Sequence, residues 1–305
     1  MRPKLNVEKI ETYTGHRDAV YTVISGPESG SFFSSGGDGQ VVLWQTKSPD
    51  LGKLVAKLTN SVYALWLDKK SNRLWIGHNF DGIIVIDLQN QHVWKTFPLG
   101  NVAIYALTGN DTSVWAGDGH GRIIQWDLET GNLVAVWQAG NQRIRSLLVE
   151  GSLGRLYIGS SDHHIRVWDI AGHRWIKEWK AHEGSVFGLA WSKQANQVIS
   201  VSRDARINMW STLDEFALVT AIPAHMYAIH AASISSDGRW LATGSMDKSI
   251  KIWDLPTGQL VKVIDKGRFV GHGTSINALT WLPGTWELIA ASDDRTLSHW
   301  SVQLS

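Results

Sequence analysis

The chain of 305 residues contains no cysteine, which excludes disulfide bonds, thiolate metal sites and cysteine nucleophiles. It also lacks any apolar run near the roughly 18 residues that a membrane-spanning helix needs, and its first residues lack the apolar stretch of a signal peptide. Neither sign of charge dominates, because 29 lysines and arginines oppose 28 aspartates and glutamates. These absences predict a cytoplasmic protein of a reducing compartment, with no nucleic acid and no membrane among its partners.

One recurring stretch organises the rest of the chain, and its clearest copy is SMDKSIKIWD at Ser245–Asp254. A polar turn is followed by a run in which polar and apolar residues alternate, which is typical of a half-buried strand. Seven copies follow one another at intervals of 40 to 47 residues, a period that indicates an array of identical structural units. The copies end at Trp44, Ile86, Trp126, Trp168, Trp210, Trp253 and Trp300.

Each unit contains four short strand patterns separated by turns, and no segment keeps a helical period. Seven units of four antiparallel strands predict an all-β fold, a seven-bladed β-propeller. The last unit has only a few residues after Trp300, so we expect the N-terminal strand Leu5–Tyr13 to complete it and close the ring. Residues 1–305 are thus expected to form a single domain. The predicted blades are Gly15–Leu58, Thr59–Phe97, Pro98–Gln138, Ala139–Lys180, Ala181–Pro223, Ala224–Val270, and Gly271–Ser305 with Leu5–Tyr13.

With Gly-His near the start of a blade and Trp-Asp at the end of its third strand, the chain resembles the WD40-repeat family. The resemblance implies a hydrogen-bonded tetrad of His, Ser or Thr, Asp and Trp within a blade. The first, fifth and sixth blades contain all four residues, whereas the seventh has Ala290 at the hydroxyl position and the second has none of the four. The third blade keeps only Trp126, and we expect the second and third blades to be the least stable part of the ring. The complete tetrads are His16, Ser34, Asp38 and Trp44; His182, Ser200, Asp204 and Trp210; and His225, Thr243, Asp247 and Trp253.

Because the His-Ser-Asp set recurs from blade to blade, we interpret it as structural and not as a catalytic triad. Other histidines give no metal site, since His163 and His164 are adjacent and would point to opposite faces of a strand. His78 and His120 occupy irregular turns and are expected to be exposed to solvent. No cofactor, metal ion or catalytic residue is therefore predicted.

The resemblance implies that partners bind where loops gather around the central channel, and that each blade contributes a residue five positions after its His. Four of these seven residues are aromatic, and the residues two positions earlier are small, except at Arg143. Arg203, before the turn Asp of the fifth blade, adds a third arginine to Arg143 and Arg145. The seven five-after residues are Tyr21, Tyr63, Tyr105, Arg145, Phe187, His230 and Asn277.

Tyrosine and arginine commonly anchor protein interfaces, so we expect a non-catalytic scaffold, monomeric alone, that binds a protein or peptide with an acidic segment. One alternative is a reader of small ligands or modified peptides, in which Tyr21, Tyr63 and Tyr105 cage a methylated ammonium. A second alternative is an enzyme that uses the channel. It would need carboxylates and histidines at the mouth, where the ring offers His230 and the nearest carboxylate is Asp293.

Overall fold

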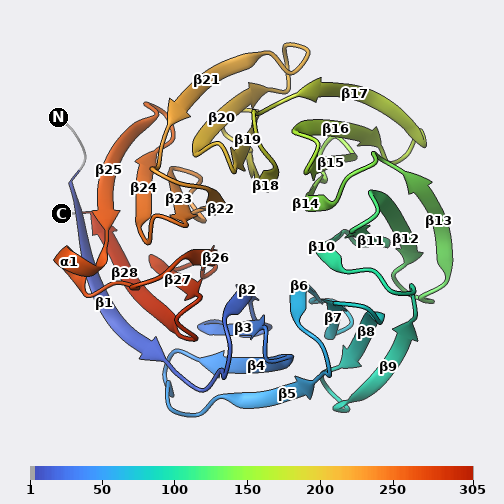
Figure 1. Ribbon diagram of the computed structural model, residues 1–305, viewed down its shortest axis with the longest axis horizontal. Coiled ribbons are helices and arrows are strands. Elements are labelled where there is room, and N and C mark those ends of the chain that lie inside the picture. The colour runs from blue at the N-terminus through green and yellow to red at the C-terminus, as the bar shows by residue number, and fades with distance from the viewer. Residues whose placement is uncertain (1–3, 305) are drawn as a thin grey trace.

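The computed structural model describes residues 4–304 and shows seven four-stranded antiparallel sheets arranged as blades around a central channel (Figure 1). In the first six blades the strands follow in chain order from the channel outwards. The seventh blade has the order β26-β27-β28-β1, so its outermost strand comes from the N-terminus. The predicted seven-bladed propeller, closed by the N-terminal strand, is confirmed.

The strand bounds agree closely with the predicted blades. The first four blades are β2 Val20–Ser25, β3 Ser31–Gly36, β4 Gln40–Gln45 and β5 Lys53–Lys57; β6 Val62–Asp68, β7 Arg73–His78, β8 Gly82–Asp87 and β9 His92–Phe97; β10 Ile104–Gly109, β11 Ser113–Asp118, β12 Arg122–Asp127 and β13 Leu133–Gln138; and β14 Ile144–Glu150, β15 Arg155–Ser160, β16 His164–Asp169 and β17 Arg174–Lys180.

The remaining blades are β18 Val186–Ser192, β19 Gln197–Ser202, β20 Arg206–Ser211 and β21 Leu218–Pro223; β22 Ile229–Ile234, β23 Trp240–Ser245, β24 Ile250–Asp254 and β25 Gln259–Ile264; and β26 Ile276–Trp281, β27 Glu287–Ser292 and β28 Leu297–Leu304 with β1 Leu5–Tyr13. A one-turn helix, α1 Lys266–Phe269, lies at the outer rim between the sixth and seventh blades (Figure 1). No helix within residues 4–304 is long and apolar enough to cross a membrane.

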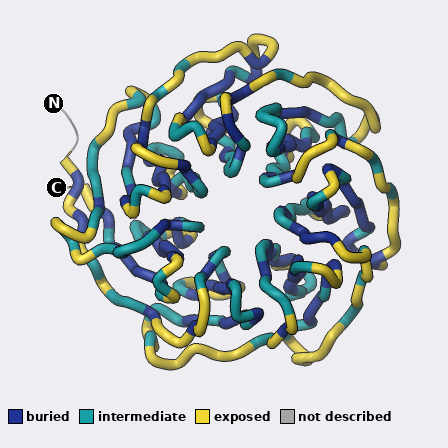
Figure 2. The backbone as a smooth tube through the Cα atoms, in the orientation of Figure 1, coloured by how far each residue is buried: buried dark blue, intermediate teal, exposed yellow. Residues whose placement is uncertain are grey.

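The hydrophobic core lies between neighbouring blades, in clusters that each join two of them. Figure 2 shows the outermost strands mainly exposed and the strands nearer the channel buried or partly buried. One cluster, for example, joins Trp75 and Ile83 of the second blade to Val114 and Trp126 of the third. Apolar residues on both faces of the inner strands explain this arrangement, because each sheet must bury both of its faces against a neighbour.

Four blades form the hydrogen-bonded tetrad. In the fifth blade His182 lies 2.9 Å from Asp204 and 2.8 Å from the hydroxyl of Ser200. The Trp210 indole donates to the same hydroxyl at 2.8 Å. Buried polar groups are thus satisfied within one blade, which supports the structural interpretation of the repeated set.

The seventh blade recovers the hydroxyl that Ala290 lacks. Ser298 lies directly across from Ala290 on β28, and its Oγ is 2.8 Å from Nε2 of His272. The Trp300 indole donates to that oxygen at 2.7 Å, and Asp294 binds His272 at 2.7 Å. The tetrad therefore persists with its hydroxyl on the neighbouring strand.

The prediction that His78 is exposed is wrong, whereas His120 is exposed as expected. His78 is the last residue of β7, and only 2% of its surface is accessible. The corresponding residue in the fourth to seventh blades is a buried serine. Neither ring nitrogen has a hydrogen-bond partner within residues 4–304. The residue lies at the end of a buried inner strand and not in the turn, which is why the sequence pattern misplaced it.

Candidate functional site

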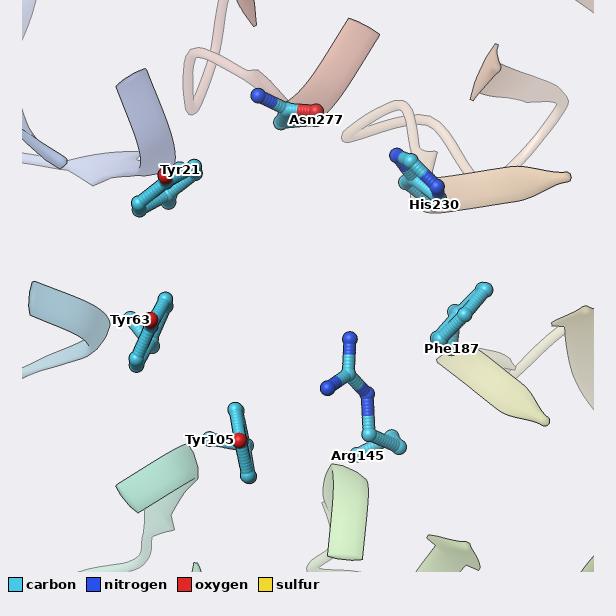
Figure 3. Close-up of a pocket in the computed structure, with 7 residues that line it drawn as sticks. All are labelled: Tyr21, Tyr63, Tyr105, Arg145, Phe187, His230 and Asn277. Atoms are coloured by element: carbon cyan, nitrogen blue, oxygen red, sulfur yellow. The ribbon is translucent and has the colours of Figure 1, made fainter. Parts of the chain in front are cut away.

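The seven residues that lie five positions after the His of each blade, which we call the ring residues, meet at one end of the channel (Figure 3). We call this end the channel mouth. They line a cavity of about 450 Å³, and each blade contributes one of them from the start of its innermost strand. The preceding residue in each strand, such as Val62 or Ile104, is fully buried between blades. Alternation along the strand then directs the next side chain towards the channel.

A β-bulge shapes this position in every blade. The register between the first and second strands shifts across the ring residue, between Val62 and Ala64 in the second blade for example. The same shift occurs at all seven ring residues. Bulges leave one residue out of the ladder and re-aim its side chain, so the fold presents these seven side chains systematically.

Three tyrosines form a continuous aromatic arc on one side of the mouth. The ring centres of Tyr21 and Tyr63 are 5.3 Å apart, as are those of Tyr63 and Tyr105, with interplanar angles of 31° and 36°. Burial, and then the neighbouring Tyr63, Asp18 and Asp293, raise the pKa of Tyr21, so its hydroxyl stays protonated at neutral pH.

Arg145 continues the arc and reaches into the channel (Figure 3). Its guanidinium lies 4.7 Å from the ring centre of Tyr105 and 4.8 Å from that of Phe187, within the range of cation–π attraction. Burial lowers the pKa of Arg145, and the charge of Arg143 acts in the same direction. In the part of the chain that the structure describes, Arg145 forms no ion pair with a carboxylate, so it presents an uncompensated positive charge to the cavity.

The other side of the mouth is polar. The Phe187 and His230 rings meet edge to face at 5.3 Å, and Ser275 Oγ lies 3.3 Å from Nδ1 of His230. Ser275 also donates to Asn277, whose amide donates to Asp293 at 2.7 Å and to the Val20 carbonyl at 3.0 Å. Burial lowers the pKa of His230, which leaves the imidazole neutral at pH 7.

Arg143 and Arg203 do not line the cavity. The Arg143 guanidinium lies 5.9 Å from the ring centre of Tyr105, and both arginines are exposed. The sequence grouped the three arginines together, whereas only Arg145 lines the cavity, with Arg143 near the same Tyr105 ring. The sequence did not predict that the Ser275 hydroxyl would contact both His230 and Asn277, because we expected its small side chain only to leave the ring residues uncovered.

The WD40 family model, described as "WD domain, G-beta repeat", matches residues 7–45, 174–211, 216–254 and 264–301, together half of the chain. The chain is 26% identical to Protein tipD of Dictyostelium discoideum over 94% of its own length and 48% of that protein. It is also 26% identical to Autophagy-related protein 16 of Arabidopsis thaliana, over 82% of this chain and 50% of that one. The chain therefore spans about half the length of these curated relatives.

The Anaphase-promoting complex subunit cdc20 of Dictyostelium discoideum is 27% identical over 58% of this chain and 36% of that protein. Among solved structures, the WD40 β-propeller domain of Doa1 superposes with a TM-score of 0.84 at 21% identity and covers 97% of both chains. That likeness concerns the fold.

Proposed function

The chain belongs to the WD40-repeat family, whose propellers typically act as protein-interaction scaffolds, and on this premise we propose that it is a non-catalytic scaffold that holds a protein or peptide at the channel mouth. Residues 1–305 would act as one intracellular, monomeric unit. The name of the relative cdc20 describes that protein as a subunit of a complex, which is consistent with such a role.

The proposal is supported chiefly by the guanidinium of Arg145, which lies between two aromatic rings at the edge of the cavity and forms no ion pair within residues 4–304. An arginine held flat by its neighbours loses little side-chain entropy when it binds a carboxylate bidentately. The tyrosine arc adds rigid apolar area with polar tips, as interface anchors do. The partner would therefore place an acidic side chain or a chain terminus at Arg145, with exposed Arg143 and Arg203 extending the contact.

The alternative of a methylammonium cage is less well supported. The positive charge of Arg145 lies against Tyr105, one of the three rings that would form the cage, and would repel a second cation there. The enzyme alternative is also less well supported, because Asn277 lies between His230 and Asp293 and donates to the carboxylate, so the imidazole and the carboxylate are not joined directly.

A pull-down from the source cell's lysate tests the proposal. It compares the wild type with a variant that combines Tyr21→Ala, Tyr63→Ala and Arg145→Glu. A matched control combines Leu133→Ala, Trp175→Ala and Arg174→Glu on the exposed outer strands. Circular dichroism first establishes that all three proteins are folded.

Partners retained by the wild type and the control but lost by the ring variant would support docking at the channel mouth. Partners retained equally by all three would contradict it and direct attention to the blade edges. If no partner binds even the wild type, the small-ligand alternative gains weight over the scaffold.

A further inference from the structure

The second blade differs from the other six at the end of its third strand, where Ile86 replaces the tryptophan. In the other blades this tryptophan packs against the outer strand of the preceding blade. Trp126 contacts Phe97 with ring centres 5.2 Å apart, and Trp168 contacts Trp137 at 5.0 Å. The indole thus fills the outer part of the boundary between two blades.

The boundary between the first and second blades lacks both partners of this contact. In the second, third and fourth blades, the outer strand has an aromatic residue at one equivalent position, opposite an isoleucine of the third strand. The pairs are Phe97 with Ile83, Trp137 with Ile123, and Trp179 with Ile165. In the first blade Ala56 has that position, opposite Val41. Ala56 therefore packs against the cluster that contains Ile86, where the boundaries on either side hold two aromatic rings.

A pocket of about 210 Å³ lies at this boundary. Its apolar wall comes from Leu43, Leu54 and Val55 of the first blade and from Ile86 and Leu88 of the second. It is also lined by the turns after β2, β6 and β8, which are at the opposite end of the strands from the channel mouth. The pocket is thus a separate feature from the candidate site, on the other face of the propeller.

Asn72 gives this pocket a polar group. Its backbone has a φ of 55° in the turn between β6 and β7, and its carbonyl accepts the amide of Leu88. Its side-chain Oδ1 is buried and has no hydrogen-bond donor within the described residues. Asn72 lines the pocket, so a rotation of its side chain would turn this unsatisfied acceptor towards a ligand with a flat apolar body and a single N–H donor.

The charged residues at the rim of the pocket indicate which kind of residue would lie next to the bound ring. Lys53 is exposed there and forms no ion pair among residues 4–304, whereas Glu28 already accepts a hydrogen bond from Gln45. We propose that this pocket binds the indole of a tryptophan in a partner peptide, with the indole N–H on Asn72 and an adjacent acidic residue on Lys53. The partner would supply the ring that the second blade lacks.

The experiment titrates the full chain with the blocked dipeptide acetyl-Asp-Trp-amide, labelled with fluorine on the indole and followed by ¹⁹F NMR. A second probe replaces the indole with benzothiophene, which keeps the shape but removes the N–H. We expect the wild type to bind the indole probe about fivefold more tightly, since one neutral hydrogen bond distinguishes the two. Asn72→Gly tolerates the positive φ and should abolish this preference.

Two variants block the pocket independently. Ile86→Trp fills it from within, and Leu54→Glu places a negative charge at its mouth, where the leucine is 53% exposed and the new carboxylate would repel the aspartate of the probe. Each should weaken binding of the indole probe at least about tenfold. Because Leu54 is exposed, Leu54→Glu should fold even if Ile86→Trp does not. Tyr63→Ala, at the channel mouth, should leave binding of the probe unchanged.

Loss of probe binding in Tyr63→Ala but not in Leu54→Glu would overturn the proposal, since the probe would then occupy the channel. Absence of binding to the wild type at millimolar probe would also overturn it. Sedimentation velocity provides a further check: self-association that Leu54→Glu abolishes would assign the pocket to a second copy of the chain instead.

Discussion

At the scale of single residues, the seventh blade shows that the tetrad requires a hydroxyl at a point in space and not at a position in the sequence. Ser298 Oγ is within hydrogen-bonding distance of both His272 and Trp300 from the strand opposite Ala290. Facing residues of adjacent antiparallel strands are near enough to exchange such a role. The His272–Asp294 pair is thereby retained in a blade whose second strand lacks the hydroxyl.

Ser298→Ala should lower the free energy of unfolding by about 2 kcal/mol, because two buried nitrogens lose their common partner. Ala290→Ser should have a small effect alone but should restore much of that loss when combined with Ser298→Ala. Urea unfolding of the two single variants and the double variant measures the coupling. Simple additivity of the two changes would contradict the exchange of roles.

At the scale of elements, β1 holds the two ends of the chain together. It pairs with β28 from Leu5 to Tyr13, with one irregularity between Lys9 and Glu11. Val7 lies opposite Val302, and both side chains belong to the core of the seventh blade. This pairing joins segments that are far apart in the sequence within a single blade.

Val7→Asp should destabilise the propeller by about 3 kcal/mol or more, because it buries a charge without a partner in this strand. The urea midpoint and the rate of proteolysis near the N-terminus measure the effect. Glu8→Ala is the control, since Glu8 is exposed on the same strand and should change little. Equal behaviour of the two variants would show that β1 does not close the ring.

The second blade has none of the four tetrad residues, and its buried His78 forms no side-chain hydrogen bond within residues 4–304, with Asp81 3.9 Å away. The third blade has buried Asp118, which binds Arg122 at 2.6 Å, and Trp126 packed on Phe97. We therefore expect the second blade to open most readily, with the third nearer to the others.

Native-state hydrogen exchange should show faster exchange for the amides of β6–β9 than for those of β18–β21, because the fifth blade contains a complete tetrad. Comparison at several urea concentrations separates local opening from global unfolding. Slower exchange in the second blade than in the fifth would contradict the expectation that the tetrads determine local stability.

At the scale of the whole molecule, acid should destabilise the propeller in two stages. Burial lowers the pKa of His16 and of His225 below the ordinary value of 6.5, although Asp38 and Asp247 act in the opposite direction. The unfolded chain then binds protons more readily than the folded one. This contribution to stability is present above about pH 6.5 and is lost as the pH falls through the lower folded values.

The second stage comes from the aspartates. Burial alone would raise the pKa of Asp294, but hydrogen bonds from His272 and Thr296 outweigh it and lower this pKa to about 2. The pKa of Asp247 is lowered likewise, again against the effect of burial, chiefly by the hydrogen bond from His225. This stability is present above about pH 4 and is lost as the pH falls towards 2.

Scanning calorimetry from pH 8 to pH 3 should therefore show a Tm that decreases below about pH 6.5 and decreases more steeply below about pH 4. A Tm that is constant or rises as the pH falls from 7 to 5 would contradict the first stage. His225→Gln should reduce the dependence on pH in that range, since it removes one of the titrating groups.

The repeat pattern of the sequence was sufficient to predict the seven blades and the closing strand, and its resemblance to the WD40-repeat family indicated the residues that line the channel mouth. The period of about 42 residues and the alternation of polar and apolar residues within each strand are local features of the sequence. They recur seven times, so the strand pattern predicted for one blade is supported by the pattern in the others. Tertiary structure decided the contacts that depend on distances between blades and strands. It placed Arg145 between Tyr105 and Phe187, recruited Ser298, buried His78, and left a pocket beside Ile86. These features arise because side chains from different blades meet only when the ring closes, and the repeat pattern of one blade carries no information about what its neighbour leaves unfilled.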